Sequence, residues 1–236
     1  MVMTETDAGA ASSERDIRSY GRIKSRAFSK ARETLMAEDF PRYRLSDDAL
    51  PDIPSLAEGR EGLFLEIGFG NGGHMIACAR NHPEYMYIGA EPFLNGVGAA
   101  AAAVKEHDLS NVRIYNGDSR HILRTVPAEL FDGIYILFPD PWPKTRHHKK
   151  RLLQQPFLSL AAQKITPGGR MLIATDHEDY AAFVAEELDK TEELTRINED
   201  IFAEPPEWTQ TKYQRKALKE GREAQFFDMR RLSSAR

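Results

Sequence analysis

The chain has 236 residues, of which 41% are hydrophobic, and a formal net charge of −4, so it can bury the core of one sizeable α/β domain with appendages. Its single cysteine, Cys78, excludes an internal disulfide framework and fits a reducing, cytoplasmic location. No apolar run approaches the roughly 18 residues that span a bilayer, so we expect no membrane partner, and residues 1–14, which lack the apolar segment of a signal peptide, are expected to be a disordered leader.

The predicted elements alternate between apolar strands and helices. A strand at residues 63–67 enters a glycine turn and a helix that ends near residue 81, and a second strand follows at residues 85–92. The later elements are, in order, a helix at 95–107, a strand at 112–119, a short helix at 120–126, a strand at 132–140, a helix at 154–165 that stops at "TPGG", a strand at 170–176, a helix at 178–190 and a late strand within 223–232.

This alternation predicts an α/β fold of the Rossmann-like kind, with a mostly parallel, doubly wound sheet and a late antiparallel strand. Residues 15–58 precede the first strand and are rich in Lys and Arg, so they are expected to form a basic N-terminal arm. The sheet domain is expected to span residues 59–236.

Positive charge is concentrated in three segments of this acidic chain. Residues 15–44 hold nine Lys and Arg against four Asp and Glu, residues 144–151 hold five cations and no acid, and residues 212–222 hold five cations against one acid. The rest of the chain therefore carries a net charge of −18. Because a local field attracts polyanions, these segments are either solvated helix faces or contacts for a nucleic acid.

An acidic residue lies at the end of each of the first four predicted strands. Glu66 lies near the end of the first strand, Glu91 ends the second, Asp118 follows the third and Asp140 follows the fourth. Ligands of open α/β sheets bind beyond the carboxyl ends of the strands. Any one of these acids alone is typical of a solvated strand end, but together they indicate a binding site.

The glycine turn does not identify the ligand by itself. Gly68 and Gly70 belong to a GxGxG turn that also satisfies, through Gly73, the GxGxxG pattern of dinucleotide sites. Glu66, just before the turn, would repel a pyrophosphate but can hold an ammonium group, and Asp118 can accept a hydrogen bond from an adenine amine. A ligand with an adenine, a ribose, a free amine and no phosphate is S-adenosylmethionine.

The segment "LFPDPWPKTRHHKKR" places one acid in a rigid, basic setting. Pro139 and Pro141 restrict the backbone around Asp140, and Trp142 can either pack as an anchor or stack on a base. A carboxylate there can accept hydrogen bonds from N1–H and the exocyclic amine of guanine. The cations and histidines that follow suit the phosphates of an RNA strand: they are Lys144, Arg146, His147, His148, Lys149, Lys150 and Arg151.

The motifs "LEIGFGNGG", "GAEP", "LFPDPWPKTRHHKKR", "ATDHEDY" and "TKYQ" together resemble those of the tRNA (guanine-N7-)-methyltransferase family, and the basic arm is similar to the family's N-terminal segment. The resemblance implies a class I methyltransferase domain that transfers methyl from S-adenosylmethionine to N7 of guanosine 46 in the variable loop of tRNA. It implies cofactor contacts at Glu66, Gly68, Gly70, Glu91, Asp118 and Asp140, with Asp140 also catalytic.

The resemblance further implies substrate contacts at Lys144, Asp176, Thr211, Lys212, Tyr213 and Gln214, and RNA contacts at residues 146–151. The family segment usually ends in Glu where this chain has Gln214, which can still accept a hydrogen bond but lacks the charge. Asp176 on its own is more often a helix cap, and the resemblance makes the substrate contact an equal alternative. We expect no metal site, because His74, His121 and His177 have no metal-ligand spacing with Cys78, and we assign these histidines no chemistry.

Three other functions fit parts of the pattern. A methyltransferase for another RNA nitrogen, such as an exocyclic amine, commonly has a double proline after the fourth strand, which "PDPW" lacks. A non-catalytic RNA-binding module would not need the full acid and glycine set. A nicotinamide dehydrogenase is disfavoured by Glu66. The tRNA substrate fits either a monomer or a homodimer.

Overall fold

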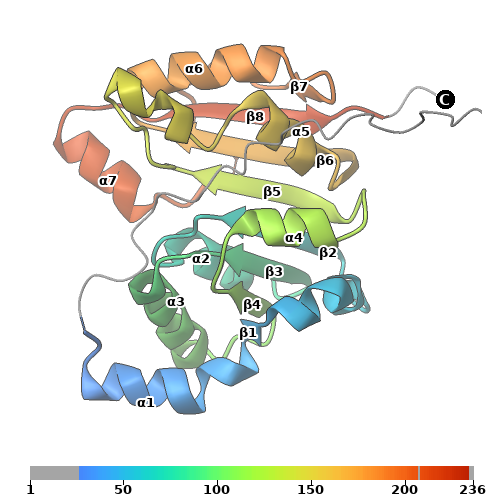
Figure 1. Cartoon of the computed structure of the whole chain (residues 1–236), viewed down its shortest axis with the longest axis vertical. Coiled ribbons are helices and arrows are strands. Elements are labelled where there is room, and N and C mark those ends of the chain that lie inside the picture. The colour runs from blue at the N-terminus through green and yellow to red at the C-terminus, as the bar shows by residue number, and fades with distance from the viewer. Residues whose placement is uncertain (1–26, 207, 234–236) are drawn as a thin grey trace, which may run out of the picture.

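Eight strands form one sheet in the computed structural model, which describes residues 27–206 and 208–233. Their order is β1-β4-β3-β2-β5-β6-β8-β7 (Figure 1). β8 runs antiparallel to β6 and β7, and the other pairs are parallel. The strands are β1 (Arg44–Leu45), β2 (Gly62–Ile67), β3 (Tyr85–Ala90), β4 (Val112–Tyr115), β5 (Phe131–Leu137), β6 (Ile165–Thr175), β7 (Leu194–Arg196) and β8 (Gln225–Arg231).

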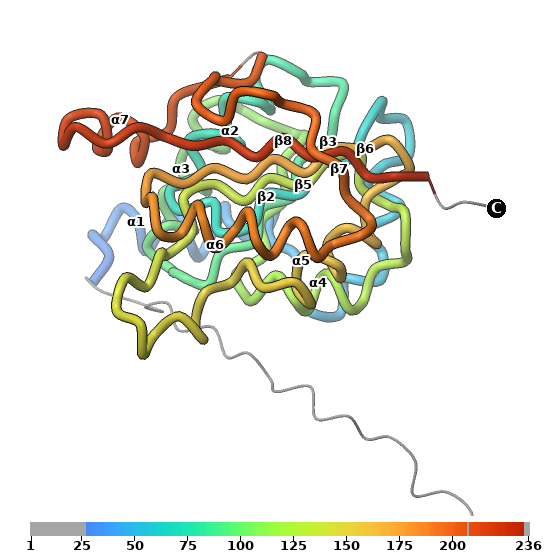
Figure 2. Tube along the Cα trace, turned by 90° about the horizontal axis from the view of Figure 1, so that it is seen from above, coloured from blue at the N-terminus to red at the C-terminus, as the bar shows by residue number. Residues whose placement is uncertain are grey.

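Helices cover both faces of this sheet. In Figure 2, α4, α5 and α6 lie along one side and α2 lies on the other, while α1 packs on α3. The helices are α1 (Lys30–Glu38), α2 (Gly73–Asn81), α3 (Leu94–Glu106), α4 (Ser119–Thr125), α5 (Gln155–Ala162), α6 (Glu178–Asp189) and α7 (Lys212–Lys219), with 3-10 helices η1 (Phe40–Arg42), η2 (Asp47–Ala57) and η3 (Thr145–Lys150). The predicted doubly wound α/β fold with a late antiparallel strand is confirmed.

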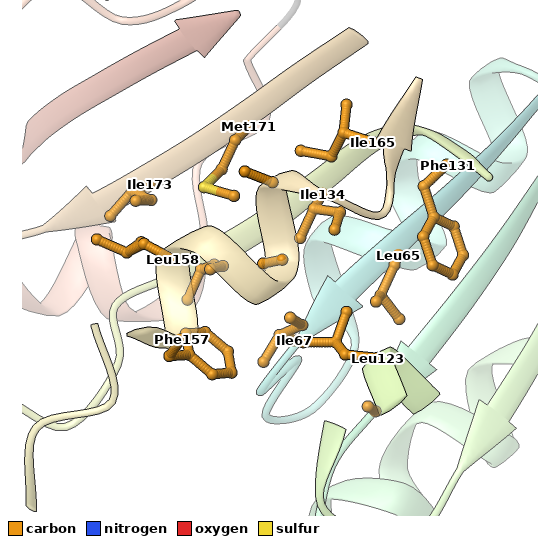
Figure 3. Packing of buried hydrophobic residues seen from close by; sticks show 14 of the residues in the cluster. Leu65, Ile67, Leu123, Phe131, Ile134, Phe157, Leu158, Ile165, Met171 and Ile173 are labelled. Carbon is orange, nitrogen blue, oxygen red and sulfur yellow. The ribbon is translucent and has the colours of Figure 1, made fainter. Parts of the chain in front are cut away.

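The central strands are apolar because both of their faces are covered. Leu65 of β2 and Ile134 of β5 are 0% exposed, and they pack with Phe157 and Leu158 of α5 in the main core cluster (Figure 3). Burying one such side chain contributes about 1.5–3 kcal/mol. This core holds the carboxyl ends of β2 to β5 in register, which brings the loops that follow them to one rim of the sheet.

The helix predicted at residues 154–165 is shorter than expected, and its "TPGG" stop belongs to a strand. α5 ends at Ala162, and Thr166 to Gly169 lie inside β6. The N–H groups of Leu130 and Phe131 both donate to the carbonyl of Lys164. The pairing of β5 with β6 therefore begins before the glycines, which are accommodated at an irregularity in the register.

Part of the predicted basic arm packs into the same core. β1 pairs with β4 through Arg44 opposite Ile114, and Leu50 and Ile53 of η2 are 2% and 0% exposed. The leader and residues 15–26 lie outside the described residues. The division of the chain near residue 59 stays a prediction, since residues from η2 contribute to the hydrophobic cluster of the sheet domain.

Candidate cofactor and substrate site

A cavity of about 630 Å³ lies at the carboxyl ends of β2 to β5. It is lined by residues from all four of these strand ends, among them Gly68, Gly70, Glu91, Asp118 and Asp140. A smaller cavity of about 20 Å³ shares Gly68 with the larger one and is lined also by Glu66. The structure therefore brings together the acids and glycines that the sequence predicted, although Glu66 faces the smaller cavity.

The turn after β2 has a backbone that favours glycine. Gly68 and Gly70 have φ angles of 70° and 60°, in the left-handed region that other residues adopt at a cost of about 1–2 kcal/mol. A Cβ on Gly68 would meet nothing within 4 Å, so it would project into open space. On the other side of the turn, a Cβ on Gly96 of α3 would lie 2.1 Å from the carbonyl oxygen of Gly70. The turn thus combines a glycine backbone with close helix packing and leaves room for a ligand.

Glu91 is held in place by the backbone around it. Its Oε2 accepts from the N–H of Gly70 at 2.8 Å and its Oε1 accepts from the N–H of Phe93 at 2.9 Å. Burial raises the pKa of Glu91 above its ordinary value, and the two N–H groups oppose that rise. A carboxylate oriented in this way at the cavity wall can accept hydrogen bonds from the two hydroxyls of a ribose.

Asp118, which also lines this cavity, forms the cap of α4 and an ion pair. Its Oδ1 accepts from the backbone N–H and the Nε of Arg120, at 3.0 and 2.8 Å, and its Oδ2 pairs with the same guanidinium. Burial raises the pKa of Asp118, but the bonds from Arg120 outweigh burial and hold it below its ordinary value. Asp118 is therefore an oriented, ionised acceptor.

His74 is a site residue that the sequence analysis missed. Its Nδ1 lies 2.7 Å from Oε2 of Glu66, and both side chains are 5% exposed. Burial lowers the pKa of His74, but the charge of Glu66 and contacts with Cys78 outweigh it and raise the pKa to about 10. No spacing rule predicts this pair, because it joins β2 to α2 across the glycine turn. The only available signal was a histidine in the first turn of the helix after that glycine turn.

The loop that carries Asp140 is strained on both sides of this residue. Phe138 and Trp142 have φ angles of 54° and 44°, and each such conformation costs about 1–3 kcal/mol. The Trp142 ring packs under the basic turn: Nζ of Lys150 lies 4.7 Å from its centroid and the His147 ring meets it edge-on at 5.8 Å. In this structure Trp142 is therefore an anchor for the loop, while Asp140 itself is exposed at the cavity mouth.

The basic turn after this loop presents some of its cations to solvent. Lys144, Arg146 and Lys149 are exposed, and His147 and His148 are half-buried. Lys150 is half-buried and lines the large cavity. The exposed cations form one positively charged edge of the cavity mouth.

Arg151 corrects the expectation of an RNA contact at this position. Its side chain is 1% exposed and is paired with the carboxylate of Asp179 on α6. Its Nε donates to the carbonyl of Pro141 at 2.9 Å. A guanidinium enclosed in this way has no surface to offer a phosphate.

In the segment from Thr211 to Gln214, the two end residues are buried and the two middle residues are exposed. Thr211 caps α7 by accepting from the N–H of Gln214 at 3.1 Å. The Gln214 amide is 3% exposed: it accepts from Trp208 and donates to Glu204, both at 2.7 Å. Gln214 therefore holds the helix and the segment before it, and its buried amide leaves little surface for a substrate.

Lys212 and Tyr213 face outward at the cavity. Tyr213 lines both cavities, and a Cβ on Gly70 would lie 3.0 Å from the Tyr213 hydroxyl. Nζ of Lys212 lies 4.8 Å from the ring centroid of Tyr213. Figure 1 shows α7 beyond the carboxyl ends of β5 and β6. Its exposed Lys212 lines the smaller cavity and gives a second basic edge.

Asp176 is not the helix cap that it resembled. The cap of α6 is His177, whose Nδ1 accepts from the N–H of Tyr180 at 3.4 Å. Asp176 instead pairs with Arg222, with Oδ2 at 2.7 Å from one terminal guanidinium nitrogen. This pair ties the end of β6 to the segment after α7 and leaves a substrate contact of Asp176 as a prediction.

The described residues contain neither a candidate metal-binding cluster nor a helix that could span a membrane. Residues 27–206 and 208–233 contain no group of three or more His, Cys, Asp and Glu side chains placed to hold a metal ion. Within these ranges no helix combines the length and the apolar character needed to cross a bilayer.

The sequence model of a family described as putative methyltransferase matches residues 60–227. A protein of Hyphomonas neptunium named tRNA (guanine-N(7)-)-methyltransferase is 40% identical over 208 residues, which cover 86% of this chain and 94% of the relative. A protein of the same name from Caulobacter vibrioides is 37% identical over 204 residues, covering 86% and 90%. The chain belongs to the tRNA (guanine-N(7)-)-methyltransferase family. The family resemblance of the motifs is thereby confirmed.

Solved structures confirm the fold of this family member and do not decide its chemistry. An antibiotic-related methyltransferase is similar with a TM-score of 0.53 and 19% identity, covering 80% of this chain and 95% of the other. A 16S rRNA (adenine(1408)-N(1))-methyltransferase from Catenulisporales acidiphilia, solved with its cosubstrate SAM, has a TM-score of 0.52 and 15% identity, covering 81% and 94%. The [4+2]-cyclase SpnF is as similar, with a TM-score of 0.52 and 14% identity, covering 79% and 81%. The same fold therefore also carries a reaction that is not methyl transfer.

Proposed function

We infer that this protein transfers a methyl group from S-adenosyl-L-methionine to N7 of a guanosine in tRNA, at position 46 of the variable loop, forming N7-methylguanosine. The observation that carries this proposal is the placement of Asp140 at the mouth of the cavity that Gly68, Glu91 and Asp118 line. The names of the family relatives support guanine N7 of tRNA as the target. Position 46 rests on the family resemblance.

The cavity suits an adenosine that carries an amino acid. Glu91 can bind the ribose hydroxyls, Asp118 can accept from the adenine amine, and the backbone of Gly68 leaves the space that a side chain would fill. Glu66, in the adjoining smaller cavity, can hold the ammonium group. When bound, this cofactor supplies an electrophilic methyl group on a sulfonium centre.

Asp140 has an orienting and electrostatic task in this proposal. N7 of guanosine has a free lone pair and carries no proton at neutral pH, so the protein needs no general base at that atom. The Asp140 carboxylate can accept from guanine N1–H and the exocyclic amine, which aligns N7 with the methyl group. Its negative charge also favours the positive charge that develops on the purine.

The two basic edges of the cavity suit a structured RNA. Lys144, Arg146 and Lys149 lie on the η3 side, and α7 presents Lys212 on the other. Phosphate contacts from such edges position an RNA without reading its sequence. A target base of a folded tRNA must leave its stack to enter the cavity, at a cost of a few kcal/mol. A cytoplasmic location and a monomer or homodimer are consistent with this proposal.

The test is transfer of labelled methyl from S-adenosylmethionine to total tRNA, followed by mapping of the modified nucleoside. We expect N7-methylguanosine at position 46. Label at an exocyclic amine or another RNA nitrogen would favour the alternative methyltransferase. The remaining alternative is a non-catalytic RNA-binding module. Such a module would bind tRNA in calorimetry but would transfer no label, even with the cofactor bound.

A further inference from the structure

Arg151 connects the loop that carries Asp140 to α6. Its Nε donates to the carbonyl of Pro141, the residue after Asp140, at 2.9 Å. The other end of the same guanidinium is paired with Asp179, in the first turn of α6. Its central carbon lies 5.1 and 5.0 Å from the ring centroids of Tyr180 and Phe183. One planar group therefore joins the loop to a helix whose Tyr180 is in the main core cluster.

Asp140 depends for its position on its loop, which Trp142 anchors on the basic turn and which the N–H of Phe138 ties to the carbonyl of Ala174 at 2.7 Å. No hydrogen bond or ion pair between described residues holds the Asp140 carboxylate itself, so its position depends on the loop backbone. That backbone is in the left-handed region at Phe138 and at Trp142, with φ angles of 54° and 44°. Such conformations persist only where the surroundings enforce them. The bond from Arg151 to the Pro141 carbonyl lies between these constraints.

Arg151 forms a bridge between the carbonyl of Pro141 and the carboxylate of Asp179, and this bridge requires arginine. A guanidinium presents several N–H groups in a fixed plane and can bind two acceptors on different sides, whereas a lysine ammonium is a compact charge on a flexible stem. Because Arg151 is 1% exposed, it cannot serve the phosphates that its exposed neighbours face. The pKa of Asp179 is held below its ordinary value by the bond from Arg151, so the bridge keeps its charge near neutral pH.

We propose that Arg151 and Asp179 form a positioning pair for the methyl transfer, which fixes Asp140 at the cavity mouth without touching RNA or cofactor. This proposal rests on the proposed function above. It separates two roles inside one basic segment: Lys144, Arg146 and Lys149 bind phosphate, and Arg151 sets the geometry of the loop.

The kinetic test compares Arg151→Met, Arg151→Lys and Asp179→Asn with the wild-type protein. At saturating tRNA and S-adenosylmethionine, we expect kcat of Arg151→Met to fall about 10- to 100-fold, because small displacements of an orienting group cost that much. The tRNA dissociation constant and its salt dependence stay within about twofold, since no phosphate contact is lost. Arg151→Lys and Asp179→Asn each keep one half of the bridge, so they lose less.

Arg170→Met is the matched control for loss of an Arg–Asp pair elsewhere. Arg170 pairs with Asp228 at 2.7 Å between β6 and β8, in the middle of β6, and neither residue lines the cavity. We expect Arg170→Met to lower the melting temperature and keep kcat. A fall in kcat for Arg151→Met no larger than for Arg170→Met would overturn the proposal, as would weaker tRNA binding with a shallower salt dependence at unchanged kcat. If Arg151→Met does not fold, the same criteria apply to Arg151→Lys and Asp179→Asn.

A spectroscopic readout keeps this test separate from the proposed function. In a Trp208→Phe background, Trp142 is the only tryptophan of the chain and reports on the loop. We expect acrylamide to quench its fluorescence more in Arg151→Met than in Arg170→Met, even in the absence of tRNA and cofactor. Equal quenching in the two variants would refute the positioning role. A wild-type protein that transfers no methyl to tRNA would refute the function and leave the loop measurement valid.

Discussion

The Nδ1 atom of His74 lies 2.7 Å from Oε2 of Glu66 in a pair whose side chains are each 5% exposed. The pair joins the strand before the glycine turn to the helix after it. Burial lowers the pKa of His74, yet the Glu66 charge and Cys78 outweigh it and raise the pKa to about 10. The imidazole is therefore protonated at neutral pH and orients Glu66 toward the smaller cavity.

The first prediction concerns the pH dependence of stability. The folded state holds the His74 proton up to a pKa of about 10, against an ordinary value of 6.5, so the folded state binds more protons across this window. The stabilisation is complete below pH 6.5 and is lost as pH rises toward 10. His74→Asn should therefore cost about 3 kcal/mol at mildly acid pH and progressively less in alkaline solution, as measured by urea unfolding.

His107→Asn is the control for this prediction. His107 is exposed after α3, so its replacement should keep the wild-type pH profile. An identical profile for His74→Asn and wild type would show that the buried pair is not charged.

The second prediction distinguishes two effects of an added Cβ at the glycine turn: strain in the backbone and loss of space for the cofactor. Gly68 and Gly168 have similar φ angles, 70° and 81°, and a Cβ at either position would meet nothing within 4 Å. Gly68→Ala and Gly168→Ala should each destabilise the fold by about 1–2 kcal/mol. Only Gly68→Ala should weaken S-adenosylmethionine binding in calorimetry, because only its Cβ enters the cavity. Equal affinity in the two variants would contradict the assignment of Gly68 to the cofactor site.

The third prediction concerns Asp140. Asp140→Asn keeps the shape of the side chain and removes the charge that favours the developing cation, so kcat should fall about 100-fold with a smaller change in cofactor affinity. Asp48→Asn, an exposed carboxylate on η2, should leave kcat unchanged. Steady-state methyl transfer to tRNA is the measurement. Wild-type turnover in Asp140→Asn would remove this residue from the mechanism.

The fourth prediction concerns the exposed cations of η3. Lys149→Ala should weaken tRNA binding and lower the slope of log K against log salt by about 1, which is the loss of one phosphate contact. Lys190→Ala removes another exposed lysine, at the end of α6, and should leave the slope unchanged. Filter binding across a range of salt concentrations measures both. A wild-type slope for Lys149→Ala would show that this turn is only solvated.

The fifth prediction addresses the position where the family usually has Glu. Gln214 donates to Glu204 at 2.7 Å, so Gln214→Glu would replace a donor by a second carboxylate and should cost about 1 kcal/mol. Mutual repulsion raises the carboxyl pKa values, so the loss should be largest above neutral pH and smaller near pH ~5. Glu204→Gln should restore stability in the double variant, as measured by urea unfolding. A Gln214→Glu variant as stable as wild type would show that Glu204 is a dispensable partner.

Local runs of apolar residues in the sequence were sufficient to predict the central sheet. The runs around Leu65 and Ile134 are apolar because helices cover both faces of these strands, so neither face is exposed to solvent. The acids come at the strand ends because the rim of the sheet is accessible to solvent and ligand. β1 and β7 were missed because two or three residues make no detectable alternation. The "TPGG" segment was misplaced because a proline–glycine signal ends a helix and also fits an irregular strand.

By itself, the sequence determined the order of the strands along the chain, the glycine turn, and the set of acids and cations near the proposed reaction. Only the tertiary structure decided which of these groups face the cavity and which face each other. It paired Glu66 with His74, enclosed Arg151 beside Asp179, and turned Gln214 inward toward Trp208. The physical reason is that burial and pairing depend on contacts between segments far apart in the chain, and a charged residue looks the same in a sequence whether it meets solvent or a partner.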